Sequence, residues 1–210
     1  MVAVFAHPDD EAFGPGGTIA KLSKDHEITV ICVTPGDAGQ NIKTADTRKK
    51  ELRASAKILG VKNVIFLNYK DGTLSNSVYH QLAADIEKEL KRIKPEILMT
   101  FDIKGVSGHI DHIVVSLVTT FVFHRLSFVR ELFYYCNNLE RSKILGEDYF
   151  IHFPGGYKQS EINEFIDVSK YWDIKISAMM AHKSQRFDAE RILSKTAHLP
   201  KEECFLVLKK

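Results

Sequence analysis

Residues 1–22, MVAVFAHPDDEAFGPGGTIAKL, carry an apolar run, a cluster of charges and a glycine-rich segment in that order. The apolar run at residues 2–6 has the length and the β-branched content of a buried strand. HPDDE at residues 7–11 then sets three consecutive carboxylates beside a histidine. Like charges this close together repel one another, so the cluster needs a positive species nearby. The whole stretch predicts a strand, a charged loop and a helix, which is the opening half of a βαβ unit.

The alternation of apolar runs with helical patterns continues through the first two thirds of the chain. Further strands are expected at residues 27–33, 63–67 and 96–101. Helices are expected at residues 47–60, 77–94 and 113–123. This order is typical of an α/β fold with a mostly parallel sheet.

The last third of the chain has a looser pattern. Strands are expected at residues 131–137, 148–153 and 203–209. Residues 169–185 have the spacing of a helix, with Ser169 as its N-terminal cap. The aromatic-rich segment 126–136 is a candidate for a sheet edge or an interface, and the sequence leaves open whether the chain forms a homo-oligomer.

Composition limits the classes of function. With 210 residues, 44% of them hydrophobic, the chain 1–210 is expected to form a single domain. Its 29 basic and 27 acidic residues leave a net charge of +2, which gives no general attraction for nucleic acid or anionic membranes. The expected partner is therefore a small molecule. The three cysteines form no CxxC pair, and neither a signal-peptide pattern nor a membrane-length apolar run is found, so a reduced, cytoplasmic protein is expected.

A polar loop follows each of the first four expected strands. These loops are HPDDE at 7–11, TPGDAGQ at 34–40, LNYKDG at 67–72 and FDIKGVSGHIDH at 101–112. The carboxyl ends of parallel strands share one edge of the sheet, and open α/β sheets bind their ligands there. The polar chemistry of the chain is therefore expected to converge at that edge.

Two of these loops contain the side chains of a catalytic metal site. A catalytic zinc ion takes about three protein ligands from histidine and carboxylate side chains and keeps one position open. His7 and Asp10 offer two ligands, and either His109 or His112, which share one side of a helix start, can complete the set. Either motif alone is as consistent with an acidic surface turn or a solvated helix face. Their joint placement favours the metal site.

A competing interpretation takes Gly14, Gly16 and Gly17 as a phosphate-binding loop between a strand and a helix. Their spacing differs from the dinucleotide fingerprint, and three carboxylates would lie where the anion binds. A tight turn and close helix packing explain the glycines better.

Several motifs together resemble one known family. AHPDDE and the GGT after it, TRKKELRASAKILGV, NYKDG, SGHIDH and AHKSQ are similar to the LmbE-like (PIG-L) family of zinc-dependent N-acetylglucosaminyl deacetylases. The resemblance covers most of the chain and implies a Rossmann-like fold with helices on both faces of the sheet. It also implies one Zn²⁺ per chain and removal of an N-acetyl group from an N-acetylglucosamine-containing small molecule.

The resemblance also implies a role for individual residues. It places the zinc ligands at His7, Asp10 and His112, the general base at Asp9 and the oxyanion-stabilising histidine at His109. It places substrate contacts at Arg48 and Asp71, and an outer layer of the site at His182 and Gln185. Ile110 stands where the family often has proline, which puts the local loop shape in question.

The chemistry of these residue types agrees with amide hydrolysis. A zinc-bound water has a pKa near about 7, and a carboxylate such as Asp9 can take its proton. His109 can stabilise the oxyanion, and His109 or protonated Asp9 can protonate the leaving amine. Glu11 and Asp111 are expected to orient ligands. Arg48 lies at an expected helix start, where the helix dipole disfavours a cation, and a binding role would explain its position.

Two other functions stay open. A zinc hydrolase acting on a different C–N bond, such as an amide in a thiol conjugate or a modified antibiotic, would keep every catalytic residue and differ only in its loops. A non-catalytic sugar-binding or metal-binding module would more naturally lack Asp9 or His109, and both are present. Loops 37–46, 103–108 and 136–160 are expected to select the group attached to the sugar.

Overall fold

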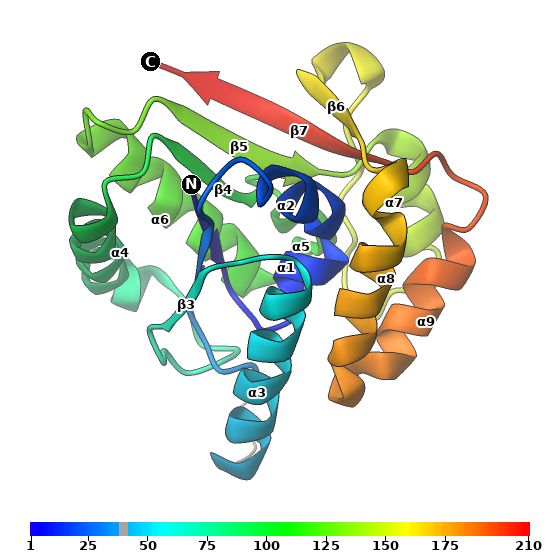
Figure 1. Cartoon of the computed structure of the whole chain (residues 1–210), viewed down its shortest axis with the longest axis horizontal. Coiled ribbons are helices and arrows are strands. Elements are labelled where there is room, and N and C mark those ends of the chain that lie inside the picture. Colours follow the sequence, from blue (N-terminus) through cyan, green and yellow to red (C-terminus); the bar gives the residue numbers. More distant parts are fainter. Residues whose placement is uncertain (38–41) are drawn as a thin grey trace.

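A single seven-stranded sheet organises the molecule, in the strand order β3-β2-β1-β4-β5-β7-β6 (Figure 1). The structure is a computed structural model, and it describes residues 1–37 and 42–210. The strands are β1 Val2–Phe5, β2 Thr29–Cys32, β3 Asn63–Phe66, β4 Ile97–Phe101, β5 Glu131–Cys136, β6 Glu164–Asp167 and β7 Glu202–Lys209. The first five strands pair in parallel, whereas β7 runs antiparallel to both β5 and β6. The predicted α/β fold with a mostly parallel sheet is confirmed.

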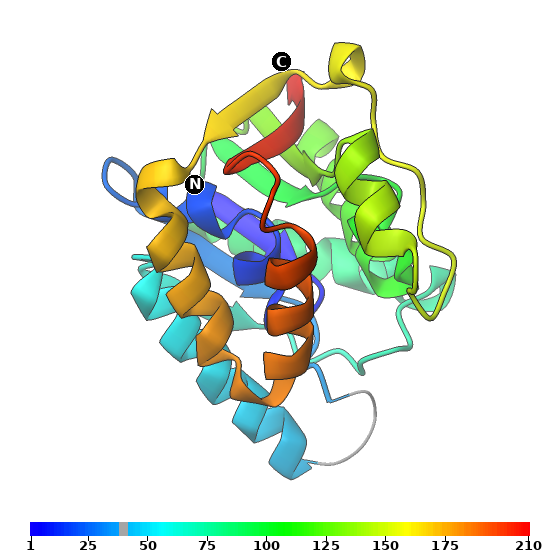
Figure 2. The ribbon, with the colours of Figure 1, turned by 90° about the vertical axis from the view of Figure 1, so that its right-hand side faces the viewer.

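Helices cover both faces of the sheet because successive side chains of each central strand point to opposite faces. The helices are α1 Asp10–Phe13, α2 Gly16–Leu22, α3 Ile42–Ile58, α4 Tyr79–Ile93, α5 Gly105–Gly108, α6 Ile110–Arg125, α7 Leu139–Gly146, α8 Trp172–Ala181 and α9 Arg186–Lys195. Val2 and Val4 of β1 pack into the same core as α4 and α6. Ala3 and Phe5 belong to the core on the other face, together with residues of α2, α8 and α9. Figures 1 and 2 show this three-layer arrangement.

Strands β1 and β2 form where the sequence predicts them because they are apolar on both faces. Every residue of β1 and β2 is buried, as expected for the interior strands of a parallel sheet. The run at 113–123 is helical, as predicted, and lies within α6, but it is buried on one side only, because Leu117 and Phe121 are exposed. Among the described helices, none combines the length and the apolar character that crossing a membrane requires.

Several predictions for the first helices and loops need correction. The helix predicted at 47–60 begins earlier, at Ile42, and ends at Ile58. Part of the predicted loop 37–46 is therefore helical, and residues 38–41 lie outside the described residues. The predicted loop 103–108 contains the short helix α5.

The last third of the chain departs furthest from prediction. Residues 148–153 form no strand, and α7 lies inside the predicted loop 136–160. Segment 126–136 supplies β5, which pairs on both sides and is therefore not a sheet edge. The helix predicted at 169–185 is broken into a 3-10 turn, α8 and a second 3-10 turn, and Ser169 lies in the first turn and does not cap α8. Strand β6 and helix α9 were not predicted from the sequence.

Candidate metal and catalytic centre

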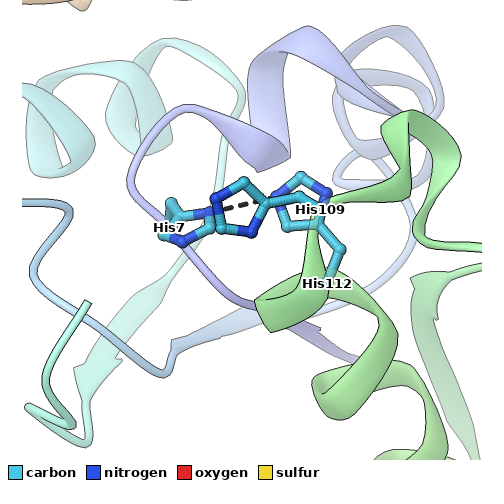
Figure 3. A group of neighbouring side chains, drawn as sticks. All are labelled: His7, His109 and His112. Carbon is cyan, nitrogen blue, oxygen red and sulfur yellow. Dashed lines mark hydrogen bonds between the residues drawn. The ribbon is translucent and has the colours of Figure 1, made fainter. Parts of the chain in front are cut away.

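The predicted site residues come together at the carboxyl ends of the parallel strands, around a pocket of about 420 Å³. His7 follows β1, Asp71 follows β3, and His109 and His112 stand at the start of α6. Figure 3 shows the three imidazole rings grouped above the end of the sheet. The pocket volume falls in the range of small-molecule sites.

His7 and His112 face each other through one nitrogen each, with Nδ1 of His7 lying 3.0 Å from Nε2 of His112. The opposite nitrogens meet acceptors. Nε2 of His7 lies 2.9 Å from a carboxylate oxygen of Asp71, and Nδ1 of His112 lies 3.0 Å from the carbonyl oxygen of Gly105. Because these partners can only accept, they place the protons on the outer nitrogens. Two lone pairs then point at each other, and this arrangement requires a proton or a cation between them.

Asp10 completes the group around these two nitrogens. Its carboxylate oxygens lie 3.2 Å from Nε2 of His112 and 3.8 Å from Nδ1 of His7. A tetrahedral zinc ion with bonds of about 2.0–2.1 Å separates its ligand atoms by about 3.3–3.4 Å, so these separations bracket the required value. The backbone N–H of His7 donates to Asp10 at 2.9 Å and fixes the carboxylate in place. The donor set of two imidazoles and one carboxylate fits a divalent ion.

Electrostatics favour positive charge at this position. Burial alone would lower the pKa of His7, but hydrogen bonds to Asp111 and Asp71 and the charge of Asp10 outweigh burial and raise the pKa to about 10. Burial would raise the pKa of Asp10, but the charge and hydrogen bond of His112 lower it to about 2. The carboxylates of the HPDDE segment therefore stabilise a cation on or between these side chains.

Asp111 joins the loop after β3 to the metal-binding group. Its carboxylate accepts from the backbone N–H groups of Gly72 at 2.8 Å and Leu74 at 3.0 Å, and lies 3.3 Å from Nε2 of His7. It is almost fully buried. This geometry agrees with the expectation that Asp111 orients a ligand, and it also fixes Asp71 beside His7.

His109 caps α6 and lines the pocket. Its Nδ1 accepts from the backbone N–H of Asp111 at 3.2 Å, so the proton of the neutral ring is on Nε2. Burial and the charges of His7 and His112 lower the pKa of His109. Ligand atoms of His7, His109 and His112 lie within 4.8 Å of one another, so His109 could also bind a metal ion.

Asp9 is held in an unusual backbone conformation by its neighbours. Its φ angle is 112°, in the left-handed region that residues other than glycine rarely adopt. Its carboxylate contacts the guanidinium of Arg48 at 2.8 Å, and its backbone N–H donates to Glu11 at 3.0 Å. Burial raises the pKa of Asp9 to about 6, although Arg48 acts in the opposite direction. Asp9 therefore projects a carboxylate of raised basicity into the pocket.

Arg48 makes more contacts with the protein than its predicted substrate-binding role suggests. Besides Asp9, its guanidinium donates to the carbonyl oxygens of Gly36 at 2.6 Å and Pro8 at 2.5 Å. Gly36 has a φ of +70°, and a Cβ atom there would lie 2.9 Å from the guanidinium carbon, so only glycine allows this approach. Arg48 is 9% exposed, and its contacts show how it fixes Asp9.

Glu11 anchors the HPDDE segment to the helices behind it. One carboxylate oxygen accepts from Ser55 at 2.5 Å and from His182 at 2.7 Å, while the other accepts from the backbone of Asp9. Glu11, Ser55 and His182 are 0–1% exposed. His182 therefore lies behind the site, as the AHKSQ motif suggests, whereas Gln185 lines the pocket itself.

The outer wall of the pocket was not predicted from the sequence. It consists of side chains from the end of β5, α7, the loop 147–153 and α9, including Asn137, Arg141, Tyr149, Phe150 and Arg191. No local motif marks these residues. The residues from Asn137 to Phe150 reach the site because they follow β5 at its carboxyl end. Helix α9 reaches it because β7, which the chain enters after α9, runs antiparallel to β5 and so begins at the same edge.

The chain is similar to known proteins over most of its length. Residues 2–123 match the family model PIG-L, described as GlcNAc-PI de-N-acetylase. A 1D-myo-inositol 2-acetamido-2-deoxy-alpha-D-glucopyranoside deacetylase of Actinosynnema mirum is 30% identical over 88% of this chain and 80% of its own length. A probable N-acetyl-alpha-D-glucosaminyl L-malate deacetylase 2 of Bacillus cereus is 28% identical over 88% of this chain and 83% of its own length.

The fold is shared with a solved structure. The N,N'-diacetylchitobiose deacetylase of Pyrococcus horikoshii superposes with a TM-score of 0.74 over 99% of this chain and 83% of that one, at 20% identity. The family model covers more than half of the chain and contains every residue of the predicted metal and catalytic centre. This chain belongs to the PIG-L family.

Proposed function

We propose that this protein is a zinc-dependent N-deacetylase that removes the acetyl group from an N-acetylglucosamine-containing small molecule. Relatives that span most of this chain are named as deacetylases of N-acetylated sugar conjugates. The observation that carries the proposal is the position of Asp9, whose carboxylate lines the same pocket as the facing nitrogens of His7 and His112. A general base beside a metal-binding group is what amide hydrolysis requires.

The metal would be held by Nδ1 of His7, Nε2 of His112 and the carboxylate of Asp10. A zinc ion bound there supplies Lewis acidity, which acidifies a water molecule and polarises the amide carbonyl. Asp71 and Gly105 orient the two imidazoles by accepting from their outer nitrogens. Such outer partners tune the ligands that they hold, so we assign Asp71 to positioning His7 as well as to the substrate contact predicted from the sequence.

Asp9 takes the proton of the attacking water in this proposal. Arg48 holds the carboxylate in place through a hydrogen bond that fixes one oxygen, which leaves the other free to face the pocket. Once protonated, Asp9 is the donor for the leaving amine. Because Arg48 lies in the pocket wall as well, its predicted contact with the sugar remains part of the proposal.

His109 stabilises the oxyanion as a neutral hydrogen-bond donor. Its Nδ1 is occupied by the backbone N–H of Asp111, so Nε2–H is the group available to the pocket. A donor fixed before reaction at the position of developing charge is the usual form of such stabilisation. This assignment differs from metal ligation by His109, which the ring positions would also allow.

Acetate release and zinc content together test the proposal. Wild-type protein is expected to bind about one zinc ion per chain and to release acetate from N,N'-diacetylchitobiose or from another N-acetylglucosaminide. His109→Ala should keep the zinc and lose most of the rate, whereas loss of the zinc would make His109 a ligand. Zinc-loaded protein that releases no acetate from any N-acetylglucosaminide, but cleaves another amide, would favour an amidase acting on a different C–N bond.

We also infer a reducing, cytoplasmic location. The three cysteines, Cys32, Cys136 and Cys204, are buried free thiols. Cys136 and Cys204 stand opposite each other on β5 and β7, where an oxidising compartment would favour their pairing. Mass spectrometry of alkylated protein from cells tests this inference by counting free thiols.

A further inference from the structure

Two polar side chains in the outer wall of the pocket lack hydrogen-bond partners. Asn137 is 3% exposed, and both its amide nitrogen and its amide oxygen are buried without a partner. Nε of Arg141, one helical turn further along, is also buried and unpaired. Both residues line the pocket that contains the metal-binding group. The backbone of Asn137 is satisfied, because its carbonyl oxygen accepts from Tyr157 at 2.9 Å.

Buried polar groups of this kind are rare because each one has lost its hydrogen bonds to water without replacing them. A side chain that served only packing would be better replaced by an apolar residue of the same size. Asn137 follows β5 directly, where the sheet fixes its position, and Arg141 lies in the first turn of α7, where the helix dipole disfavours a cation. A ligand that accepts hydrogen bonds explains both placements.

The charges around Arg141 favour an anionic ligand. No carboxylate of the described residues lies within ion-pair distance of Arg141, whereas Arg191 of the same wall lies 3.6 Å from both Asp148 and Asp188. The buried Lys175 behind this wall is paired with Glu203 at 2.5 Å. Arg141 is therefore the cation of this wall whose charge the protein does not neutralise.

The distance from the reacting centre suits a substituent on the sugar. β5 is separated from β1 by one strand, so their carboxyl ends are about 10 Å apart at the usual strand spacing. Tyr135 pairs with Phe101 in register, and the Phe101 ring packs against His112 with centroids 4.9 Å apart. A hexose with its acetamido group at the metal would bring its attached group to Asn137 and Arg141.

We propose that Asn137 and Arg141 form a subsite for a carboxylate on the group attached to the sugar. A guanidinium matches the two oxygens of a carboxylate, and the amide of Asn137 supplies a further donor. A single cation beside a neutral amide balances the one charge of a carboxylate and not the two charges of a phosphate group. This inference rests on the proposed deacetylase function and specifies its substrate class as acidic N-acetylglucosaminides.

Paired substrates test the subsite. The substrates are an N-acetylglucosaminyl malate, its diamide, a phosphate-bearing N-acetylglucosaminide and neutral diacetylchitobiose. Wild-type protein should favour the malate conjugate over its diamide by about 10- to 100-fold in kcat/KM, mainly through KM. Arg141→Met should remove this preference, because kcat/KM should fall further for the malate conjugate than for diacetylchitobiose. Asn137→Leu should weaken the same preference, and Arg141→Lys should retain part of it.

A matched control is Arg125→Met. Arg125 ends α6, is exposed and pairs with Glu87 at 3.1 Å, so its loss should change neither substrate. Zinc content and melting temperature are measured for each variant. Direct binding of free L-malate, measured by calorimetry on the wild-type, Asn137→Leu and Arg141→Met proteins, provides a second measurement that does not depend on turnover.

The outcomes separate the two levels of inference. Equal losses on acidic and neutral substrates in both variants would make Asn137 and Arg141 structural and would overturn the subsite. A wild-type preference for the phosphate conjugate or for neutral substrates would also overturn it, while acetate release would uphold the deacetylase. No acetate release from any of these substrates would refute the proposed function, and malate binding that depends on Asn137 would still support the subsite.

Discussion

Replacement of Glu11 by glutamine tests how the catalytic segment is held in place. Glu11 is 1% exposed and accepts three hydrogen bonds, from Asp9, Ser55 and His182. Glutamine has nearly the same shape, but one of its two terminal groups is a donor. If the amide nitrogen takes the place beside Asp9, it meets the backbone N–H of Asp9, which can only donate. If it takes the other place, it can no longer accept from Ser55 or from a charged His182. The variant therefore removes at least one hydrogen bond without opening a cavity.

The expected loss of stability follows from these contacts. Losing one hydrogen bond to a charged acceptor costs about 1.5–3 kcal/mol, and leaving a buried donor unpaired costs about 1–3 kcal/mol more. The sum, about 2.5–6 kcal/mol, corresponds to a fall in melting temperature of about 5–24 °C for a chain of this length. The strained backbone of Asp9, which costs about 1–3 kcal/mol, would no longer be held by Glu11.

Activity should fall with stability because Asp9 is the proposed general base. The assay combines thermal unfolding, zinc content and kcat measured well below the melting temperature. The matched control is Glu51→Gln, because Glu51 is also a buried carboxylate and accepts from the backbone and the hydroxyl of Ser184 at 2.9 and 2.6 Å. It should lose stability while keeping kcat. A Glu11→Gln protein with the wild-type melting temperature and kcat would refute the positioning of Asp9 by Glu11.

Three further predictions concern the residues around Asp9. Asp10→Ala should lose zinc and activity together, whereas Asp9→Asn should keep zinc and lose about 10²–10⁴ in kcat. Elemental analysis and kinetics of both variants check this. The opposite pattern would make Asp9 the metal ligand and Asp10 the general base. Burial raises the pKa of Asp9 and Arg48 lowers it, so Arg48→Met should raise this pKa further. The acidic limb of the kcat/KM profile should then move to higher pH by about 1–3 pH units. An unchanged limb together with a raised KM would show that Arg48 only binds the sugar. Burial lowers the pKa of His182, but the charge and hydrogen bond of Glu11 outweigh burial, so the pKa in the folded protein is raised. A histidine with a raised pKa stabilises the fold fully at pH values below its pKa in the unfolded chain, about 6.5. That stabilisation is lost as the pH rises through the pKa of the folded protein. The difference in melting temperature between wild type and His182→Gln should therefore be largest at acidic pH and shrink as the solution becomes alkaline, and a constant difference would contradict a charged His182.

The first half of the fold could be predicted because its signals are local. Each of the first four strands is a short apolar run that ends in a polar loop, and parallel pairing then brings those loops to one edge. His7 and His112 are 105 residues apart, yet the strand ends alone predict that they meet. The spacing of His109 and His112 likewise fixes which side of α6 they share.

The later elements could not be predicted because tertiary context decides them. Residues 148–153, DYFIHF, are rich in the aromatic and β-branched residues typical of a strand, but Tyr149 packs against Phe153 and both line the pocket. Segment 126–136 was given as a candidate edge because nothing in its own sequence shows that β7 will pair with it. The family resemblance predicts that Arg48 contacts the sugar, and its expected place at a helix start supports a binding role. The structure places Arg48 inside α3, which begins at Ile42, and supplies a partner for its charge in Asp9.

The two parts of the site come from different parts of the chain, and this division bears on function. All the residues that would bind metal or move protons lie within residues 2–123, which the family model matches. The wall that would contact the attached group lies between Asn137 and Ile192, outside that match. Hydrolysis of an amide imposes the same geometry on every member of a family, whereas each attached group needs its own contacts. Substrate choice is therefore best inferred from the unpaired side chains of Asn137 and Arg141, whereas the HPDDE segment indicates only which reaction is catalysed.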